Sequence, residues 1–190
     1  MKVLVHICCA PCSVACIKEL RSENVGELCG LWYNPNIHPF TEYKARRLTL
    51  VDYAKSIQLP LLTEGEYGLR YFISNIYPDY DNRCDFCYSS RLEYTAKRAK
   101  ELNLDAFTTT LLISPYQKHE LIKQTGERIA RETGIEFLYR DFRPLFRQGQ
   151  DEARELSLYM QKYCGCVFSE EERYRKKKKP IETKPEDEKK

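Results

Sequence analysis

The stretch KVLVHICCAPCS, residues 2–13, decides the fold and opens the question of function. The apolar run Val3-Leu4-Val5 predicts a short buried strand over residues 2–7. Ser13 is a favoured residue at a helix N-terminus and predicts a helix that runs to about Arg21. A buried strand followed at once by a helix is typical of the start of an α/β fold.

Three thiols, those of Cys8, Cys9 and Cys12, fall at the corner where this strand ends and the helix begins. In many α/β folds the same corner is a glycine-rich loop that holds a phosphate group, but this stretch contains no glycine. We expect Cys12 and Cys16 to pack on the core face of the helix, because a free cysteine behaves as a small hydrophobe. The alternative is a redox pair of Cys9 and Cys12, which would leave the other cysteines unexplained.

The composition is that of a soluble globular protein, with 190 residues, 42% hydrophobic and 31% charged. A net charge of only +3 excludes a strongly basic nucleic-acid binder, so any contact with RNA must come from a local patch. The sequence has no apolar run of membrane-spanning length and no signal peptide, and we therefore expect a cytoplasmic protein. Nine cysteines in a reducing compartment favour metal or redox chemistry over structural disulfides.

The rest of the chain alternates apolar strand patterns with helical periodicity, interrupted by an irregular insert at residues 66–88. This order predicts an open, mostly parallel, doubly wound α/β sheet of the Rossmann-like or PP-loop-like kind. Further strands are expected at residues 28–36, 59–65, 105–114 and 135–142. Further helices are expected at residues 41–57, from residue 89, at His119–Thr133 and at residues 150–163. Ligands of such sheets bind beyond the carboxyl ends of the strands, where the first cysteines fall.

Two domain-level segments follow from the pattern. Residues 1–170 are expected to form a single α/β metal-binding domain. Residues 171–190 are rich in lysine and glutamate and have no apolar face, so we expect a charged, disordered tail there.

Two further cysteine pairs lie far along the chain. The insert contains Cys84-Asp85-Phe86-Cys87, a spacing at which two thiolates can chelate one metal or cluster. Asp85 would add a hard oxygen ligand, although an aspartate at this place can equally cap the following helix. In Cys164-Gly165-Cys166 the glycine permits a tight turn that brings both thiols to one side.

The number of candidate ligands separates two kinds of site. Cys84, Cys87, Cys164 and Cys166 alone would complete a structural zinc site, but Cys8 and Cys9 would then have no role. Six paired thiols with Asp85 exceed the needs of one zinc ion or one cubane cluster. They suit an iron–sulfur cluster with a second metal beside it.

The three motifs together, HICCAPCS, RCDFCY and YCGC, resemble the QueH-type epoxyqueuosine reductases over about residues 1–170. The resemblance implies reduction of the epoxide of epoxyqueuosine to an alkene at the anticodon wobble position of tRNA, with electrons from a donor that the sequence does not identify. It also implies a [4Fe–4S] cluster and one additional iron ion. The positions that match the family's motifs are Cys8, Cys9, Cys84, Asp85, Cys87, Cys164 and Cys166.

Catalysis would also need a group that holds the second metal and a proton donor. We expect Asp85 to hold the second metal. His38, in the turn NPNIHPF, is a candidate proton donor, although a lone loop histidine is more often simply solvated. Five cations lie on the expected helices, and we expect most of them to be solvated: Arg46, Arg47, Lys97, Arg98 and Lys100.

Two other functions remain open from the residues. One is an iron–sulfur, PP-loop-like tRNA sulfur transferase, which would need a glycine-containing nucleotide loop that the first strand lacks. The other is a non-enzymatic, zinc-stabilised RNA-binding protein. Iron and acid-labile sulfide in anaerobically purified protein would separate these functions.

Overall fold

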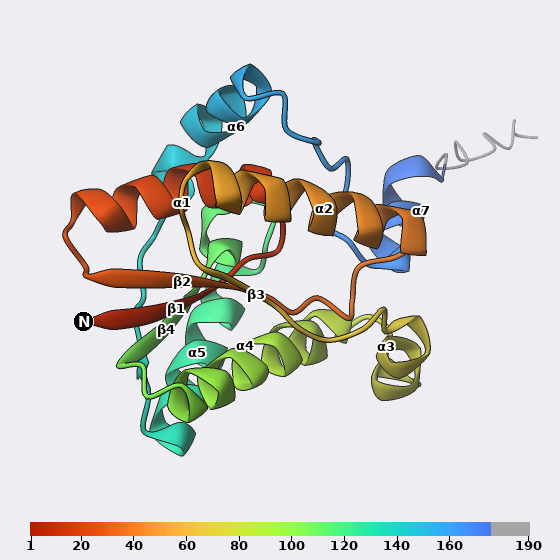
Figure 1. The fold of residues 1–190 in the computed structure, drawn as a ribbon. Helices are drawn as coiled ribbons and strands as arrows, with labels where there is room; N and C mark the ends of the chain where they lie inside the picture. The colour runs from red at the N-terminus through yellow and green to blue at the C-terminus, as the bar shows by residue number, and fades with distance from the viewer. Residues whose placement is uncertain (176–190) are drawn as a thin grey trace, which may run out of the picture.

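The computed structural model describes residues 1–175, and its centre is a parallel β-sheet (Figure 1). The five strands lie in the order β3-β2-β1-β4-β5, and every neighbouring pair is parallel. This topology confirms the predicted α/β sheet. The strands are β1 (Lys2–His6), β2 (Glu27–Trp32), β3 (Leu61–Thr63), β4 (Ala106–Thr109) and β5 (Glu136–Phe137).

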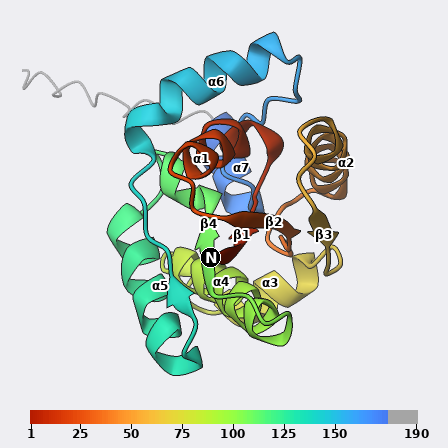
Figure 2. The same cartoon turned by 60° about the vertical axis from the view of Figure 1, so that its left-hand side comes forward.

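Helices cover both faces of the sheet, as a doubly wound fold requires. In Figure 1, α1 (Ala10–Ser22) and α2 (Phe40–Ser56) lie above the sheet, and α4 (Arg83–Glu101) and α5 (His119–Thr133) lie below it. Figure 2 shows α6 (Phe146–Glu155) lying across the outside of α1. The two shorter helices are α3 (Leu69–Ile76) and α7 (Val167–Tyr174).

The strand order places a switch point beside β1. The chain moves from β1 to β2 and β3 on one side, and then crosses back to β4 and β5 on the other. The loops after β1 and β4 therefore diverge at the same carboxyl edge, which is where ligands of such sheets bind. The backbone N–H of Cys8, after β1, donates to the Thr110 hydroxyl, after β4, at 3.3 Å.

The position of β1 in the core explains why its residues 3–5 are all apolar. Val3, Leu4 and Val5 are fully buried, since helices cover both faces of this central strand. Close packing of α6 on α1 depends on Gly149, because a Cβ at this position would lie 2.9 Å from the Cβ of Ala15. The apolar core thus holds α6 against the helix that begins at the first cysteine group.

Several element boundaries differ from the sequence-based prediction. The insert contains α3, and α4 begins at Arg83 rather than at residue 89, so the Cys84 pair lies inside a helix. The strand expected at residues 105–114 ends at Thr109 and continues as the 3-10 helix η1 (Thr110–Ile113). A second 3-10 helix, η2 (Arg143–Leu145), precedes α6, which ends at Glu155, eight residues before the predicted end. The extended connection after α6 carries the last two cysteines to the carboxyl edge.

The predicted domain boundary at residue 170 falls within α7, and the predicted tail from residue 176 onward lies outside the described residues. Within residues 1–175, every helix is too short or too polar to span a bilayer.

Candidate metal centre

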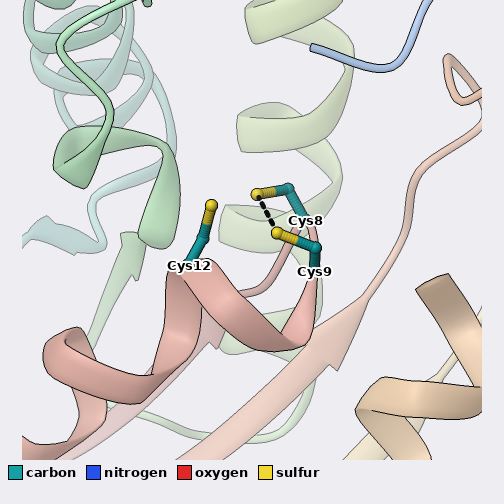
Figure 3. A group of neighbouring side chains, drawn as sticks. All are labelled: Cys8, Cys9 and Cys12. Carbon is teal, nitrogen blue, oxygen red and sulfur yellow. Dashed lines mark hydrogen bonds between the residues drawn. The ribbon is translucent and has the colours of Figure 1, made fainter. Parts of the chain in front are cut away.

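Cys8, Cys9 and Cys12 form a buried cluster at the corner between β1 and α1 (Figure 3). Cys9 is the N-cap residue of α1, and Cys12 lies in the first turn of this helix, so its thiol points back toward the other two. The three sulfur atoms lie within 4.8 Å of one another, and the Sγ atoms of Cys8 and Cys9 are 3.7 Å apart. In residues 1–175 this is the one group of three or more metal-ligating side chains with such close donor atoms.

The three thiols have very different proton affinities. Hydrogen bonds from Cys12, Cys9 and Thr110 hold the pKa of Cys8 well below its usual range, despite burial. Burial raises the pKa of Cys9. The hydrogen bonds of Cys12 to Cys8 and Cys9 raise the pKa of Cys12. The corner therefore favours one thiolate, on Cys8, with two neighbouring thiols that can lose their protons to a bound metal.

The second pair, Cys84 and Cys87, lies on one face of the first turn of α4. Cys87 is buried and packs with Cys166, Phe72 and Ile76 in a small apolar cluster. Burial raises the pKa of Cys87 to about 12. The second and third cysteine pairs are thus in contact, although they are about eighty positions apart in the chain.

Gly165 shapes the third pair, since its φ of 145° is accessible to glycine but costly for other residues. The backbone bends here, as expected from the glycine, and that both thiols face one side stays a prediction. The Gln117 side-chain amide donates to the Cys164 sulfur at 3.2 Å. Tyr88 in turn donates to the Gln117 carbonyl oxygen at 2.6 Å, so α4 holds Gln117 toward the thiol.

A single cavity connects the first and third groups. Its volume is about 910 Å³, and Cys8, Cys12 and Cys164 all contribute to its wall. Two buried arginines, Arg46 and Arg91, lie among the thiols. Burial alone would lower the pKa of Arg91, but the thiols of Cys87, Cys164 and Cys8 raise it overall. One guanidinium thus lies near a thiol from each of the three groups.

Arg91 is the less expected of these two cations. Its side chain is 2% exposed, its Nη2 donates to the Cys87 sulfur at 3.1 Å, and its Nε donates to the Cys87 carbonyl oxygen at 2.8 Å. No ion pair joins it to a carboxylate within residues 1–175. A buried charge without a partner is costly, and Arg91 opposes the rise that burial gives the pKa of Cys87, so Arg91 favours anionic sulfur once a metal binds there.

Arg46 was expected on a solvated helix face, and this prediction is wrong. The side chain is buried, pairs with Glu42 at 2.7 Å, and donates to the carbonyl oxygens of Cys164 and Tyr163 at 3.0 and 2.9 Å. Arg46 therefore fixes the loop that carries the third cysteine pair. The mistake arose because charge alone does not show that a helical residue faces a buried loop.

His38 also fixes this loop. Its backbone N–H donates to the Gly165 carbonyl oxygen at 2.8 Å, and its Nδ1 accepts a hydrogen bond from the Val167 N–H at 3.4 Å. The side chain is 1% exposed, and burial lowers its pKa to about 4. The imidazole is therefore neutral near pH 7, which favours a positioning role over the predicted role of proton donor.

Asp85 lies apart from the thiol cluster. It is exposed on α4 and contributes to a second, smaller cavity of about 470 Å³ with Ser89 and Tyr94. Cys8, Cys12 and Cys164 contribute to the larger cavity instead. The structure thus brings the three cysteine groups to one edge of the sheet and places the Asp85 carboxylate on another side of α4.

Three residues of the site were missed from the sequence. Cys12 was assigned to the core, and it is buried, yet its sulfur joins Cys8 and Cys9. Arg91 follows Cys87 by four positions and Cys84 by seven, and this spacing on one helical face was an available signal. Gln117 gave no signal, because its contact with Cys164 depends on the tertiary fold. Cys16 is buried in the core, as predicted.

Comparisons with known proteins identify the family of this chain. Residues 3–172 match the sequence profile of the family Epoxyqueuosine reductase QueH. A relative with that name from Dehalococcoides mccartyi is 36% identical over 94% of this chain and 98% of its own length. Another from Thermotoga maritima is 35% identical, over 92% of this chain and 93% of its own length.

A search of solved structures matched the U34-tRNA thiolase NcsA from Methanococcus maripaludis with its [4Fe–4S] cluster. The identity is 12%, the TM-score is 0.43, and the match covers 87% of this chain and 75% of that chain. A likeness at this score carries no argument about function. The family profile and the nearly full-length relatives do, and they show that this chain belongs to the epoxyqueuosine reductase QueH family of oxidoreductases.

Proposed function

We propose that this chain reduces the epoxide of epoxyqueuosine in tRNA to the alkene of queuosine, with a [4Fe–4S] cluster and one additional iron ion. The reaction consumes two electrons and two protons, and the epoxide oxygen leaves as water. The observation that carries the proposal is that Cys8, Cys12 and Cys164, from two of the cysteine groups, line one cavity, while Cys87 of the remaining group packs with Cys166. Family membership supplies the substrate class.

The donor set fits an iron–sulfur centre. Thiolates are the usual ligands of such clusters, and the three cysteine groups offer seven thiols, more than the four that a structural zinc ion takes. The candidate ligands are Cys8, Cys9, Cys12, Cys84, Cys87, Cys164 and Cys166. The buried Arg91, without a carboxylate partner in the described residues, is suited to balance the negative charge of such a centre.

The closest thiols suit a single metal ion. Two sulfur atoms bound tetrahedrally at about 2.3 Å from one metal lie about 3.8 Å apart. The Sγ atoms of Cys8 and Cys9 are 3.7 Å apart, which supports shared binding of one ion by this pair. The wider groups on α4 and before α7 are then the candidates for a larger cluster.

When bound, such a centre supplies electrons one at a time and a Lewis acid for the epoxide oxygen. The chain's own residues orient the ligands. Thr110 contacts the Cys8 sulfur, Gln117 donates to the Cys164 sulfur, and Arg46 holds the Cys164 backbone. His38 fixes the neighbouring turn. These contacts hold the thiol-bearing loops in place while the cavity receives the modified nucleoside.

The proposed partners and location follow from the same chemistry. The substrate is a tRNA that carries epoxyqueuosine at the wobble position, and a separate reductant supplies the electrons. We place the reaction in the cytoplasm, where thiols are kept reduced and tRNA is modified.

The activity assay is conversion of epoxyqueuosine-containing tRNA by anaerobically purified protein with a chemical reductant. We expect conversion by the wild type and loss of conversion in Cys8→Ser and Cys164→Ser. Cys29→Ser is the matched control, because Cys29 is half-buried on β2 and should leave conversion intact. Failure of the iron-loaded wild type to convert the substrate would contradict the proposal.

Asp85 lines the smaller cavity on another side of α4, so only its place in the CDFC motif supports it as a ligand of the additional iron, and one variant tests it. If the carboxylate binds that ion, Asp85→Asn loses one iron per chain and keeps the visible absorption of the cluster. Asp81→Asn, also exposed and near the start of α4, is the control. An unchanged iron count in Asp85→Asn removes the residue from the ligand set.

A further inference from the structure

We propose that the cavity rim formed by α6, the segment before α7 and the turn after η1 is the surface that docks the anticodon loop. This inference rests on the proposed function. It specifies which face of the chain meets RNA and which side chains contact it. We name this surface the α6–α7 rim and define it by Arg147, Lys162, Arg173 and Tyr116, all of which contribute to the wall of the large cavity.

Three cations of the rim have no ion-pair partner among the residues that the structure describes. Arg147 on α6, Lys162 in the connecting segment and Arg173 on α7 are exposed, and none forms an ion pair with a carboxylate of residues 1–175. By contrast, the nearby Arg154 pairs with Asp151. Unpaired cations from three separate elements around one opening suit a ligand with several negative charges, such as a phosphate backbone.

An aromatic side chain lies on the same rim. Tyr116 is 86% exposed, and its ring packs edge-on against Phe146, with centroids 5.9 Å apart. Phe146 therefore supports Tyr116 from one side, while the remaining ring surface is open to solvent. Such a surface suits stacking by an unpaired base, which RNA loops offer and duplexes do not.

The cavity continues from this rim to the thiols. Gln161 donates to the Cys12 sulfur at 3.4 Å, but its Oε1 is buried and has no hydrogen-bond partner. This oxygen can accept a hydrogen bond from an N–H or O–H group of an inserted nucleoside. A base within a duplex cannot reach such a depth, so the wobble nucleotide must leave the stack of the loop.

Charge and shape together favour RNA over an acidic protein partner. An acidic electron donor could use the same cations, but it has no need of a cavity of about 910 Å³ or of an exposed stacking surface. The rim thus combines backbone contacts, base stacking and a pocket for one extruded nucleotide.

The test is equilibrium binding of the iron-loaded protein to an RNA hairpin with a tRNA anticodon stem and loop, at several salt concentrations. The rim variant combines Arg147→Gln, Lys162→Gln and Arg173→Gln. The charge-matched control combines Lys55→Gln, Lys100→Gln and Arg131→Gln, in the last turns of α2, α4 and α5 at the amino edge of the sheet. A blunt RNA duplex of equal length is the second ligand.

We expect the rim variant to lower the slope of log affinity against log salt by about 2, since each lost phosphate contact on single-stranded RNA removes about 0.7. The control should keep the wild-type slope. Tyr116→Ala should weaken hairpin binding about tenfold, whereas Tyr116→Phe should bind like the wild type. The wild type should prefer the hairpin over the duplex.

Equal slopes for the rim variant and the control would overturn the assignment, as would equal binding of hairpin and duplex. A rim variant that binds RNA normally but accepts electrons slowly from a protein donor would assign the rim to that donor instead. These outcomes are independent of the reductase assay. RNA binding at the rim without conversion of epoxyqueuosine would keep this inference and contradict the proposed function.

Discussion

Replacement of Arg91 by glutamine tests whether this cation stabilises the fold or the metal centre. The change removes a buried positive charge while it keeps a side chain of similar length that can still hydrogen-bond to the Cys87 carbonyl oxygen. Because Cys87 is uncharged without a metal, its pKa being about 12, the sulfur in direct contact with Arg91 is not an anion in metal-free protein. The free energy of unfolding of the metal-free protein should therefore change by no more than about 1 kcal/mol.

The loaded protein should respond more strongly. A unit charge 3.1 Å from an ionised Cys87 sulfur interacts with it by about 5 kcal/mol at an effective dielectric constant of about 20. Removal of the desolvation cost of Arg91 offsets part of this energy, and hydrogen bonds to charged groups are worth about 1.5–3 kcal/mol. We therefore expect a loss of about 2–3 kcal/mol, or roughly 30- to 150-fold in iron affinity.

Anaerobic competition with a ferrous chelator measures this affinity, and urea unfolding of the metal-free protein measures stability. Lys97→Gln, an exposed position on the same helix, is the control for loss of charge. The reasoning is refuted if Arg91→Gln lowers the stability of the metal-free protein by more than about 3 kcal/mol while the iron affinity stays that of the wild type. Arg91 would then be a structural cation of the fold.

Three further predictions concern single positions. Between pH 6.5 and about 4, unfolded His38 binds a proton that the folded imidazole does not, so stability falls as the pH falls through this range. Buried His6 has a pKa lowered to the same value, so the His38 share is the difference between the wild type and His38→Asn in urea unfolding of metal-free protein, and it should be about 2 kcal/mol at pH 5. A His38→Asn variant with the same pH slope as the wild type would contradict this. Cys12→Ala should reduce the bound iron, whereas Cys16→Ala should cost about 1 kcal/mol of stability and keep the iron. Equal iron contents in these two variants would exclude Cys12 from the centre. Gly149→Ala should lower the stability by about 1 kcal/mol, because overpacking against Ala15 outweighs the gain in helix propensity. Adding Ala15→Gly to this variant should restore the stability. Additive losses in the double variant would disprove the close contact.

The sequence predicted those parts of the molecule that depend on local pattern. The apolar run of β1, the helix that Gly134 ends in a left-handed conformation, and the turn at Gly165 each follow from residues within a few positions. The parallel sheet follows from the alternation of such elements. Convergence of the three cysteine groups could be expected only because parallel strands end at one edge.

The remaining features depend on contacts between distant segments. Arg46 and Arg91 resemble solvated helical cations in the sequence, and only the fold shows that thiol-bearing loops cover them. The start of α4 could not be found locally, because the residues before Cys84 are rich in tyrosine, asparagine and aspartate, which favour turns. For the same reason the sequence could not show that Asp85, adjacent to Cys84, faces the smaller cavity on another side of α4.

The most direct test of the account is the content of iron and acid-labile sulfide per chain in protein purified without oxygen. A [4Fe–4S] cluster beside one additional iron requires about four sulfides and about five irons per chain. We predict these values together with visible absorption of the cluster, and a decrease of both in the combined variant Cys8→Ser and Cys164→Ser. A colourless protein with about one zinc ion and no sulfide would contradict the claim that three cysteine groups assemble an iron–sulfur centre here.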